Sequence, residues 1–183
     1  MKVILVSQGR TAWDDEKRVQ GTIDVPLSER GRKESAALAR KLVAFRPRRI
    51  YSGTGQTQLE TARILARTLG CGITRLAQLN ALDQGLWQGA LHAELAERCR
   101  RSYRRWRRGP QRVSPPQGES TQTMIARVAE VVAMLRRRRR SGTVVLVLPD
   151  VVRLGAQALL AGVRLETLWS ASPRAAAWTG IDI

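Results

Sequence analysis

The sequence predicts one α/β domain over residues 1–183, folded as a three-layer α/β/α sandwich around a mostly parallel central sheet. The first observation is that short apolar segments alternate with longer segments whose apolar residues recur at helical spacing. Such alternation is typical of parallel sheets that are covered by helices on both faces. The second is size, because 183 residues, 43% of them hydrophobic, are enough for one sizeable core.

The strands are predicted from short apolar runs. The first strand lies at the N-terminus and ends before Gly9, and a second aliphatic run is expected at the centre of the sheet. Two C-terminal segments are expected as edge strands. The predicted strands span residues 2–6, 49–52, 73–79, 144–148, 167–170 and 178–183.

The helices are predicted where apolar residues recur every three or four positions. Ser28 has the side chain of an N-cap, and Gly70 is expected to end the second helix. Gly109 and Pro110 are expected to end the third. The predicted helices follow Ser28 and span residues 57–69, 90–108, 121–139 and 151–160.

The composition excludes several classes of protein. The longest apolar runs are far shorter than a membrane span, and residues 1–6 are too short for the apolar part of a signal peptide. Cys71, Cys99 and the only histidine, His92, lack the spacing of a metal site. We therefore expect free thiols, no metal or cofactor, no membrane association and a cytoplasmic location.

The chain is strongly basic, with a formal net charge of +17 from 32 basic and 15 acidic residues. A charge this high attracts polyanions over long distances. Arginines concentrate in two places: residues 98–108, where they are interleaved with Tyr103 and Trp106, and the run 136–140. Within the first segment, the candidate basic surface comprises Arg101, Arg104, Arg105 and Arg108. A polyanion-binding surface and a solvated helix face both explain these charges.

Four segments carry a recognisable pattern. They are L-V-S-Q-G-R-T-A-W at residues 5–13, Q-G-T-I-D-V-P-L-S-E-R-G at 20–31, Y-S-G-T-G-Q-T-Q-L-E-T-A at 51–62 and Q-G-L-W-Q-G at 84–89. Together they resemble the histidine phosphatase (phosphoglycerate mutase-like) superfamily. The resemblance implies the phosphoglycerate mutase-like α/β fold. It also implies phosphoryl transfer through a covalent phosphohistidine.

The residues that the family uses for this chemistry are replaced. In the family, one histidine attacks phosphorus, and two arginines and a second histidine neutralise the phosphate oxygens. A glutamate protonates the leaving oxygen. Gln8 is an amide without a nucleophilic nitrogen lone pair, and no replacement can carry a positive charge. The replaced positions are Ser7, Gln8, Thr57, Ala81 and Leu148.

The loss of this residue set leads to three hypotheses. The first is a catalytically inactive family member (a pseudoenzyme) that serves as a binding or regulatory module. Its candidate partners are an unknown protein, a polyanion or a second copy of the chain in a homodimer. The second is a protein that binds nucleic acid or another polyanion through its arginine-rich surface. The third is a phosphoester hydrolase or mutase of altered mechanism. In each case Arg10, Arg18 and Arg153 are candidates for holding a small anion near the site, although surface or structural roles explain them equally.

Overall fold

The computed structural model describes residues 1–137, 141–170 and 178–183. Their sheet has five strands in the order β3-β2-β4-β1-β5, and only the edge strand β5 is antiparallel to its neighbour. The α/β fold with a mostly parallel sheet is therefore confirmed. The strands are β1 (Lys2–Ser7), β2 (Pro47–Ser52), β3 (Gly72–Arg75), β4 (Thr143–Leu148) and β5 (Trp178–Asp182).

The two central strands, β1 and β4, form the buried middle of the sheet. They pair in parallel from Lys2 with Thr143 to Ser7 with Leu148, and every residue of β4 is buried. Aliphatic side chains cover both faces of these strands, as expected for a parallel sheet with helices on each side. Along β1 the faces alternate: Val3 and Leu5 belong to one core cluster, and Ile4 and Val6 belong to the other.

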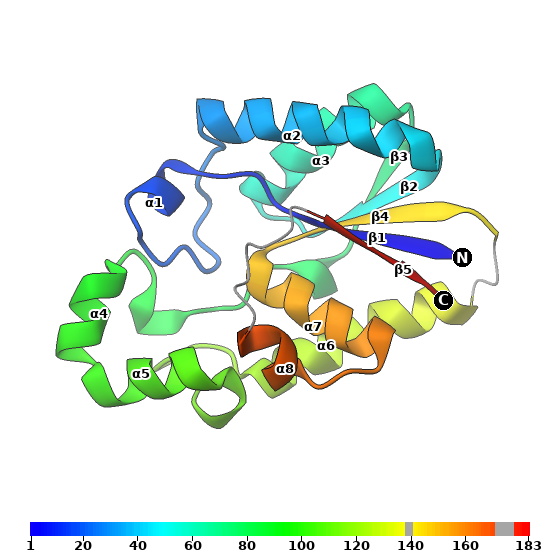
Figure 1. Cartoon of the computed structure of the whole chain (residues 1–183). Helices are drawn as coiled ribbons and strands as arrows, with labels where there is room; N and C mark the ends of the chain where they lie inside the picture. Colours follow the sequence, from blue (N-terminus) through cyan, green and yellow to red (C-terminus); the bar gives the residue numbers. More distant parts are fainter. Residues whose placement is uncertain (138–140, 171–177) are drawn as a thin grey trace.

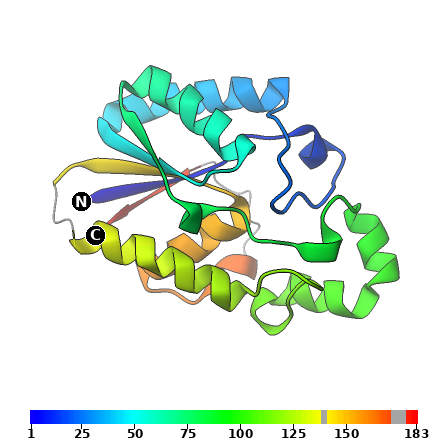
Figure 2. The same cartoon turned by 180° about the vertical axis from the view of Figure 1, so that it is seen from behind.

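Helices cover both faces of this sheet (Figures 1 and 2). On one face α2 (Glu29–Leu42) packs against α3 (Gln56–Leu69), and on the other α6 (Thr121–Arg137) packs against α7 (Asp150–Ala161). The short helix α8 (Leu165–Ser170) packs against α7. Within the described parts of the chain, no helix is both long and apolar enough to cross a membrane.

The carboxyl ends of β1 and β4 face a group of short elements. These are α1 (Ala12–Asp15), α4 (His92–Arg98) and α5 (Arg100–Arg108), which lie at the left of Figure 1. Trp87 is fully buried beneath them and contacts Tyr103 and Trp106 edge-on, with ring centroids 5.6 and 5.9 Å apart. This aromatic cluster fixes α5 to the core.

Three segments differ from the secondary structure that the sequence predicted. Residues 167–170 are not an edge strand but part of α8, because Leu165, Leu168 and Trp169 pack at helical spacing beside α7. Strand β3 ends at Arg75, and a 3₁₀ turn, Ala77–Leu79, follows it. The predicted helix over 90–108 is divided at Cys99, whose ψ of 33° is not helical.

Other predictions hold with small shifts of boundary. Ser28 caps α2 by accepting a hydrogen bond from the Gly31 amide, and Gly70 ends α3 in the left-handed conformation. The predicted helix 121–139 is described as far as Arg137, and residues 138–140 of the arginine run lie outside the described residues. Helix α1 was not predicted, since its four residues contain no apolar repeat.

We predict that Gly31→Ala destabilises the fold by about 1–3 kcal/mol, because overpacking forces neighbouring atoms to move. A Cβ atom at Gly31 would collide with the backbone of Arg10, which connects β1 to α1. Thermal denaturation measures the effect as a lower Tm. The control is Gly109→Ala, where the backbone is extended and no atom lies within 4 Å of an added Cβ. Equal melting temperatures for the Gly31→Ala variant and wild type would contradict this close approach.

Candidate active site

A cleft of about 160 Å³ lies where β1, β2 and their following segments leave the sheet. Ligands of open α/β sheets typically bind at this place, beyond the carboxyl ends of the strands. Three of the five replaced positions, Gln8, Thr57 and Ala81, line the cleft, as the family resemblance implies. The lining residues are Gln8, Gln20, Gly21, Thr22, Ile23, Asp24, Thr54, Gly55, Thr57, Gln58, Asn80 and Ala81.

The polar side chains of the cleft hold one another in place. Gln20 donates from Nε2 to Thr57 Oγ1 at 2.8 Å, and Thr57 Oγ1 donates to the Val25 carbonyl at 2.6 Å. Gln58 donates to the Leu79 carbonyl at 2.9 Å. Thr57 is buried and uses its hydroxyl within the protein, so it contributes packing and order rather than a free donor.

Two carboxamide groups remain available to a ligand. Among the described residues, neither the Gln8 side chain nor the Asn80 Nδ2 group has a hydrogen-bond partner, while Asn80 Oδ1 accepts from the Thr54 amide at 2.7 Å. An amide NH₂ donates hydrogen bonds but carries no charge. The cleft can therefore bind phosphate oxygens through neutral donors.

The electrostatics of the cleft depend on backbone rather than side-chain charge. Helix α3 begins at Gln56, and its N-terminus carries a partial positive charge that favours anions. Asp24 is the only ionisable residue among the lining, and its Oδ1 accepts the Gln56 amide at 2.7 Å. Because this carboxylate occupies part of the helix terminus, the attraction for phosphate is weaker than at a free helix end.

A hydroxyl–carboxylate pair lies beside Gln8. Ser7, the last residue of β1, donates from Oγ to Asp150 Oδ1 at 2.8 Å, and Asp150 begins α7 directly after β4. Ser7 directly precedes Gln8, which lines the cleft, so the pair adjoins the cleft, although neither Ser7 nor Asp150 is part of its lining. The sequence analysis did not identify this pair, because 143 residues separate Asp150 from Ser7.

Arg153 lies one helical turn after Asp150 and is only 3% exposed. Burial lowers the pKa of its guanidinium, and the Asp150 carboxylate raises it. The negative charge of Asp150 thus stabilises the buried guanidinium cation of Arg153. Of the three candidate arginines, Arg153 is the one associated with the Ser7–Asp150 pair.

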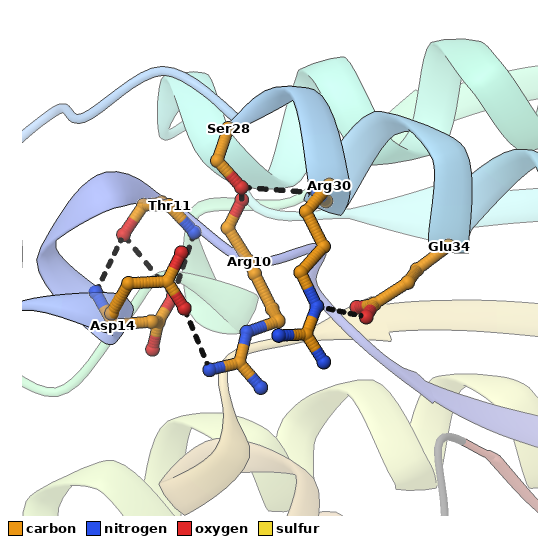
Figure 3. A network of polar contacts seen from close by, with 8 residues as sticks. Arg10, Thr11, Asp14, Ser28, Arg30 and Glu34 are labelled. Carbon is orange, nitrogen blue, oxygen red and sulfur yellow. Dashed lines mark hydrogen bonds and ion pairs between the residues drawn. The ribbon is translucent and has the colours of Figure 1, made fainter.

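Arg10 and Arg18 do not line the cleft. Arg10 forms an ion pair with Asp15 at 2.9 Å, and Arg18 forms one with Glu16 at 2.6 Å. Figure 3 shows Arg10 beside the α1 capping box, in which Thr11 and Asp14 exchange hydrogen bonds. Nearby carboxylates neutralise both arginines, and their role in anion binding stays a prediction.

Leu148 occupies the second histidine position and is fully buried at the end of β4. Its backbone carbonyl accepts the Gln8 amide at 2.8 Å, which fixes the geometry of the chain where it leaves β1. The only histidine, His92, lies in α4 and contacts the Tyr103 hydroxyl at 2.6 Å, away from the cleft lining. Among the described residues, no cluster of histidine, cysteine and carboxylate side chains has the form of a metal site.

Relatives of known name cover most of the chain. It is 32% identical over 170 residues to phosphoserine phosphatase 1 of Hydrogenobacter thermophilus, a match that covers 93% of this chain and 81% of the relative. It is 34% identical over 133 residues to the probable phosphoglycerate mutase GpmB of Cronobacter sakazakii, which covers 70% of this chain and 60% of that protein.

Solved structures match the whole fold. YhfR of Bacillus stearothermophilus superposes with a TM-score of 0.90 and 28% identity, covering all of this chain and 91% of the other. A mycobacterial glucosyl-3-phosphoglycerate phosphatase, solved in complex with VO3, superposes with a TM-score of 0.91 and 25% identity. That match covers 99% of this chain and 90% of the other.

These comparisons contradict the hypothesis of a catalytically inactive protein. The relatives that share most of the chain are named as phosphatases and a mutase, which favours the alternative hypothesis of a phosphoester-processing enzyme. The sequence analysis inferred inactivity from the loss of one residue set. The absence of a phosphohistidine removes one mechanism, but it does not by itself exclude another.

The family assignment itself is confirmed over nearly the full length. The match to the family extends from residue 3 to residue 183, which includes both central strands, the cleft and the antiparallel edge strand. The motifs recognised in the sequence lie within this range, at the end of β1 and β2 and in the segments that follow β1, β2 and β3. The chain belongs to the histidine phosphatase superfamily, branch 1.

Proposed function

We propose that this protein is a phosphoester hydrolase that uses the Ser7 hydroxyl, rather than a histidine, as its nucleophile. The observation that carries this proposal is the 2.8 Å hydrogen bond from Ser7 Oγ to Asp150 Oδ1 at the carboxyl edge of the two central strands. A nucleophile bonded to a base that is oriented by a third group is the usual arrangement for covalent catalysis. In this proposal the third group is Arg153, which lies one helical turn after Asp150 and interacts with its carboxylate electrostatically.

The reaction has two balanced halves. In the first, a lone pair of Ser7 Oγ attacks phosphorus, the P–O bond of the ester breaks, and the serine proton moves to the Asp150 carboxylate. The ester oxygen departs on the side opposite to Ser7 Oγ, because the attacking and leaving oxygens lie roughly in line, and it takes a proton from water to leave as an alcohol. In the second half, water attacks the phosphoserine and loses its proton to solvent, the bond between phosphorus and Ser7 Oγ breaks, and Asp150 returns its proton to Ser7 Oγ, which releases phosphate.

Neutral donors bind the substrate in this proposal. The Gln8 and Asn80 carboxamides donate to phosphate oxygens, and the N-terminus of α3 adds a partial positive charge. Charge-assisted hydrogen bonds are roughly twice as strong as neutral ones, so this cleft holds phosphate more weakly than one with two arginines. The loss of each preorganised donor typically costs about a hundredfold or more in turnover. We therefore expect slow turnover and weak phosphate affinity.

The nature of the substrate follows from the same geometry. Ala81 occupies the position of the family's acid and cannot protonate a leaving group, so esters of acidic alcohols should react fastest. The relatives are named for small phosphorylated compounds, and we propose small phosphomonoesters as substrates. Both cysteines are free thiols, which supports the proposal of a cytoplasmic location.

We predict that Ser7→Ala abolishes turnover of p-nitrophenyl phosphate and that Asp150→Asn lowers it by about a hundredfold or more, the usual contribution of a general base. The control variants are Ser141→Ala and Asp182→Asn, which lie at the opposite ends of the strands, with Asp182 paired to Lys2. Mass spectrometry of acid-quenched enzyme should locate phosphate on Ser7. The melting temperature of each variant separates catalytic loss from unfolding.

Two outcomes would overturn the serine mechanism. One is wild-type turnover no greater than that of the Ser7→Ala protein purified in the same way. The other is phosphate found on a residue other than Ser7.

We further predict that Ile23→Arg strengthens inhibition by inorganic phosphate about threefold to fivefold, since an exposed ion pair contributes up to about 1 kcal/mol. Ile23 lines the cleft and is 38% exposed, so an arginine fits there without repacking the core. The matched control is Leu86→Arg, because Leu86 is 65% exposed and lies outside the cleft lining. Equal gains in the two variants would show that the whole-molecule charge, and not the cleft, binds phosphate.

A further inference from the structure

Helix α5 (Arg100–Arg108) has two chemically distinct faces. Tyr103 and Trp106 are buried against Trp87, while six arginines of the same helix are exposed. At about 100° per residue, these arginines occupy a continuous arc of roughly 160°, opposite the two aromatic residues. We call this surface the α5 arginine face. It consists of Arg100, Arg101, Arg104, Arg105, Arg107 and Arg108.

No carboxylate of residues 1–137, 141–170 or 178–183 neutralises the α5 arginine face. None of the ion pairs among the described residues includes any of its six arginines. Several of them stand three or four residues apart, for example Arg100, Arg104 and Arg108, where like charges destabilise a helix. The face therefore weakens the isolated helix, and a bound polyanion would relieve that repulsion.

The buried side of α5 holds the arginines on a fixed support. The Trp106 ring contacts Trp169 edge-on at 5.7 Å, and Trp169 Nε1 donates to the Arg107 carbonyl at 3.1 Å. Because Tyr103 and Trp106 are 5% and 6% exposed, neither can stack on a nucleic-acid base. The face can offer guanidinium groups but no aromatic platform, which limits its contacts to phosphates.

We infer that the α5 arginine face binds the phosphate backbone of nucleic acid without sequence preference. Arginine matches phosphate geometry with two parallel hydrogen bonds, and a nucleic acid supplies phosphates in a continuous row. The helix extends for about 13 Å, long enough to follow several consecutive phosphates. This inference is independent of the proposed hydrolase activity.

An acidic protein surface and an anionic membrane surface fit the α5 arginine face less well than nucleic acid does. A protein partner would need an apolar or aromatic centre in the interface, and α5 presents only arginines to solvent. The large apolar side chains exposed elsewhere in the described structure belong to other elements: Ile23, Val43, Leu86 and Val163. A membrane-surface helix inserts its apolar face between lipids, but here that face is buried in the core.

The test is fluorescence anisotropy with two labelled DNA duplexes and two labelled RNA strands of unrelated sequence. Wild-type affinity should fall by about a thousandfold between about 50 and 200 mM salt if six phosphates are neutralised. Replacing Arg101, Arg104, Arg105 and Arg108 with Gln should reduce the slope of log affinity against log salt by about 3–4. The two probes of each kind of nucleic acid should bind alike within a few fold.

A matched variant separates the local surface from the net charge. It replaces Arg40, Arg46, Arg63 and Arg67 with Gln, four exposed arginines of the α2 and α3 side that form none of the ion pairs among described residues. This variant loses the same charge but should keep a salt slope close to that of wild type. The α5 variant should also melt no lower than wild type, since like-charge repulsion is removed.

Several results would overturn the inference. They include the absence of nucleic-acid binding at the lower salt concentration, an equal loss of affinity in the two variants with four substitutions, and a strong preference for one sequence. Binding of inorganic polyphosphate or of anionic lipid vesicles without binding of DNA or RNA would also exclude nucleic acid as the occupant.

Discussion

The parallel pairing of β1 with β4 is the constraint on which the rest of the structure depends. It places Ser7 opposite Leu148, and the hydrogen bond from the Gln8 amide to the Leu148 carbonyl continues the pairing one step beyond the strands. Chain segments 140 residues apart therefore leave the sheet at the same edge. The cleft lies at that edge of the sheet. The N-terminus of α7 and the helices α4 and α5 lie on the same side of the molecule.

The replacements at this edge agree with one another physically. Leu148 is fully buried, at a place where a histidine would need a hydrogen-bond partner. The Thr57 hydroxyl donates a hydrogen bond to the Val25 carbonyl. The Ser7 hydroxyl is satisfied by Asp150, whose charge stabilises the buried Arg153. The edge of the sheet thus carries neutral hydrogen-bond donors beside one partly buried hydroxyl–carboxylate pair. Such an arrangement is easier to stabilise without ligand, because it has no cluster of like charges.

The sequence predicted the fold well where local rules decide it. The aliphatic runs identified β1 and β4, and Ser28 and Gly70 set the ends of two helices. It failed at 167–170, because a segment of six residues satisfies both strand and helix patterns until its packing against α7 is known. It also missed the break at Cys99, which depends on a local backbone turn rather than on a Gly or Pro.

The candidate site could be predicted only in part. The register of the motifs assigned Gln8, Thr57 and Ala81 to one site, and all three residues line the cleft. The Ser7–Asp150 pair could not be found, since a contact across 143 residues follows from strand order and not from spacing. The inference of inactivity failed for a related reason. It compared residues one by one with a single mechanism, whereas a new acid–base pair is visible only when both strands are brought together.

Charge is distributed unevenly between the cleft and the surface, and this separation has a functional consequence. The lining of the cleft contains one ionisable residue, an aspartate, while α5 exposes six arginines that form no ion pair in the part of the chain that the structure describes. A net charge of +17 raises the local concentration of any anion near the protein, but it does so without selecting among them. Selection among anions must then come from the hydrogen-bond geometry of the cleft, which fits a small phosphate group and gives a long polyanion little additional affinity. A long polyanion gains instead from the row of guanidinium groups on α5, where many weak phosphate contacts add together. The two surfaces proposed to bind anions therefore differ in the kind of anion that each can hold.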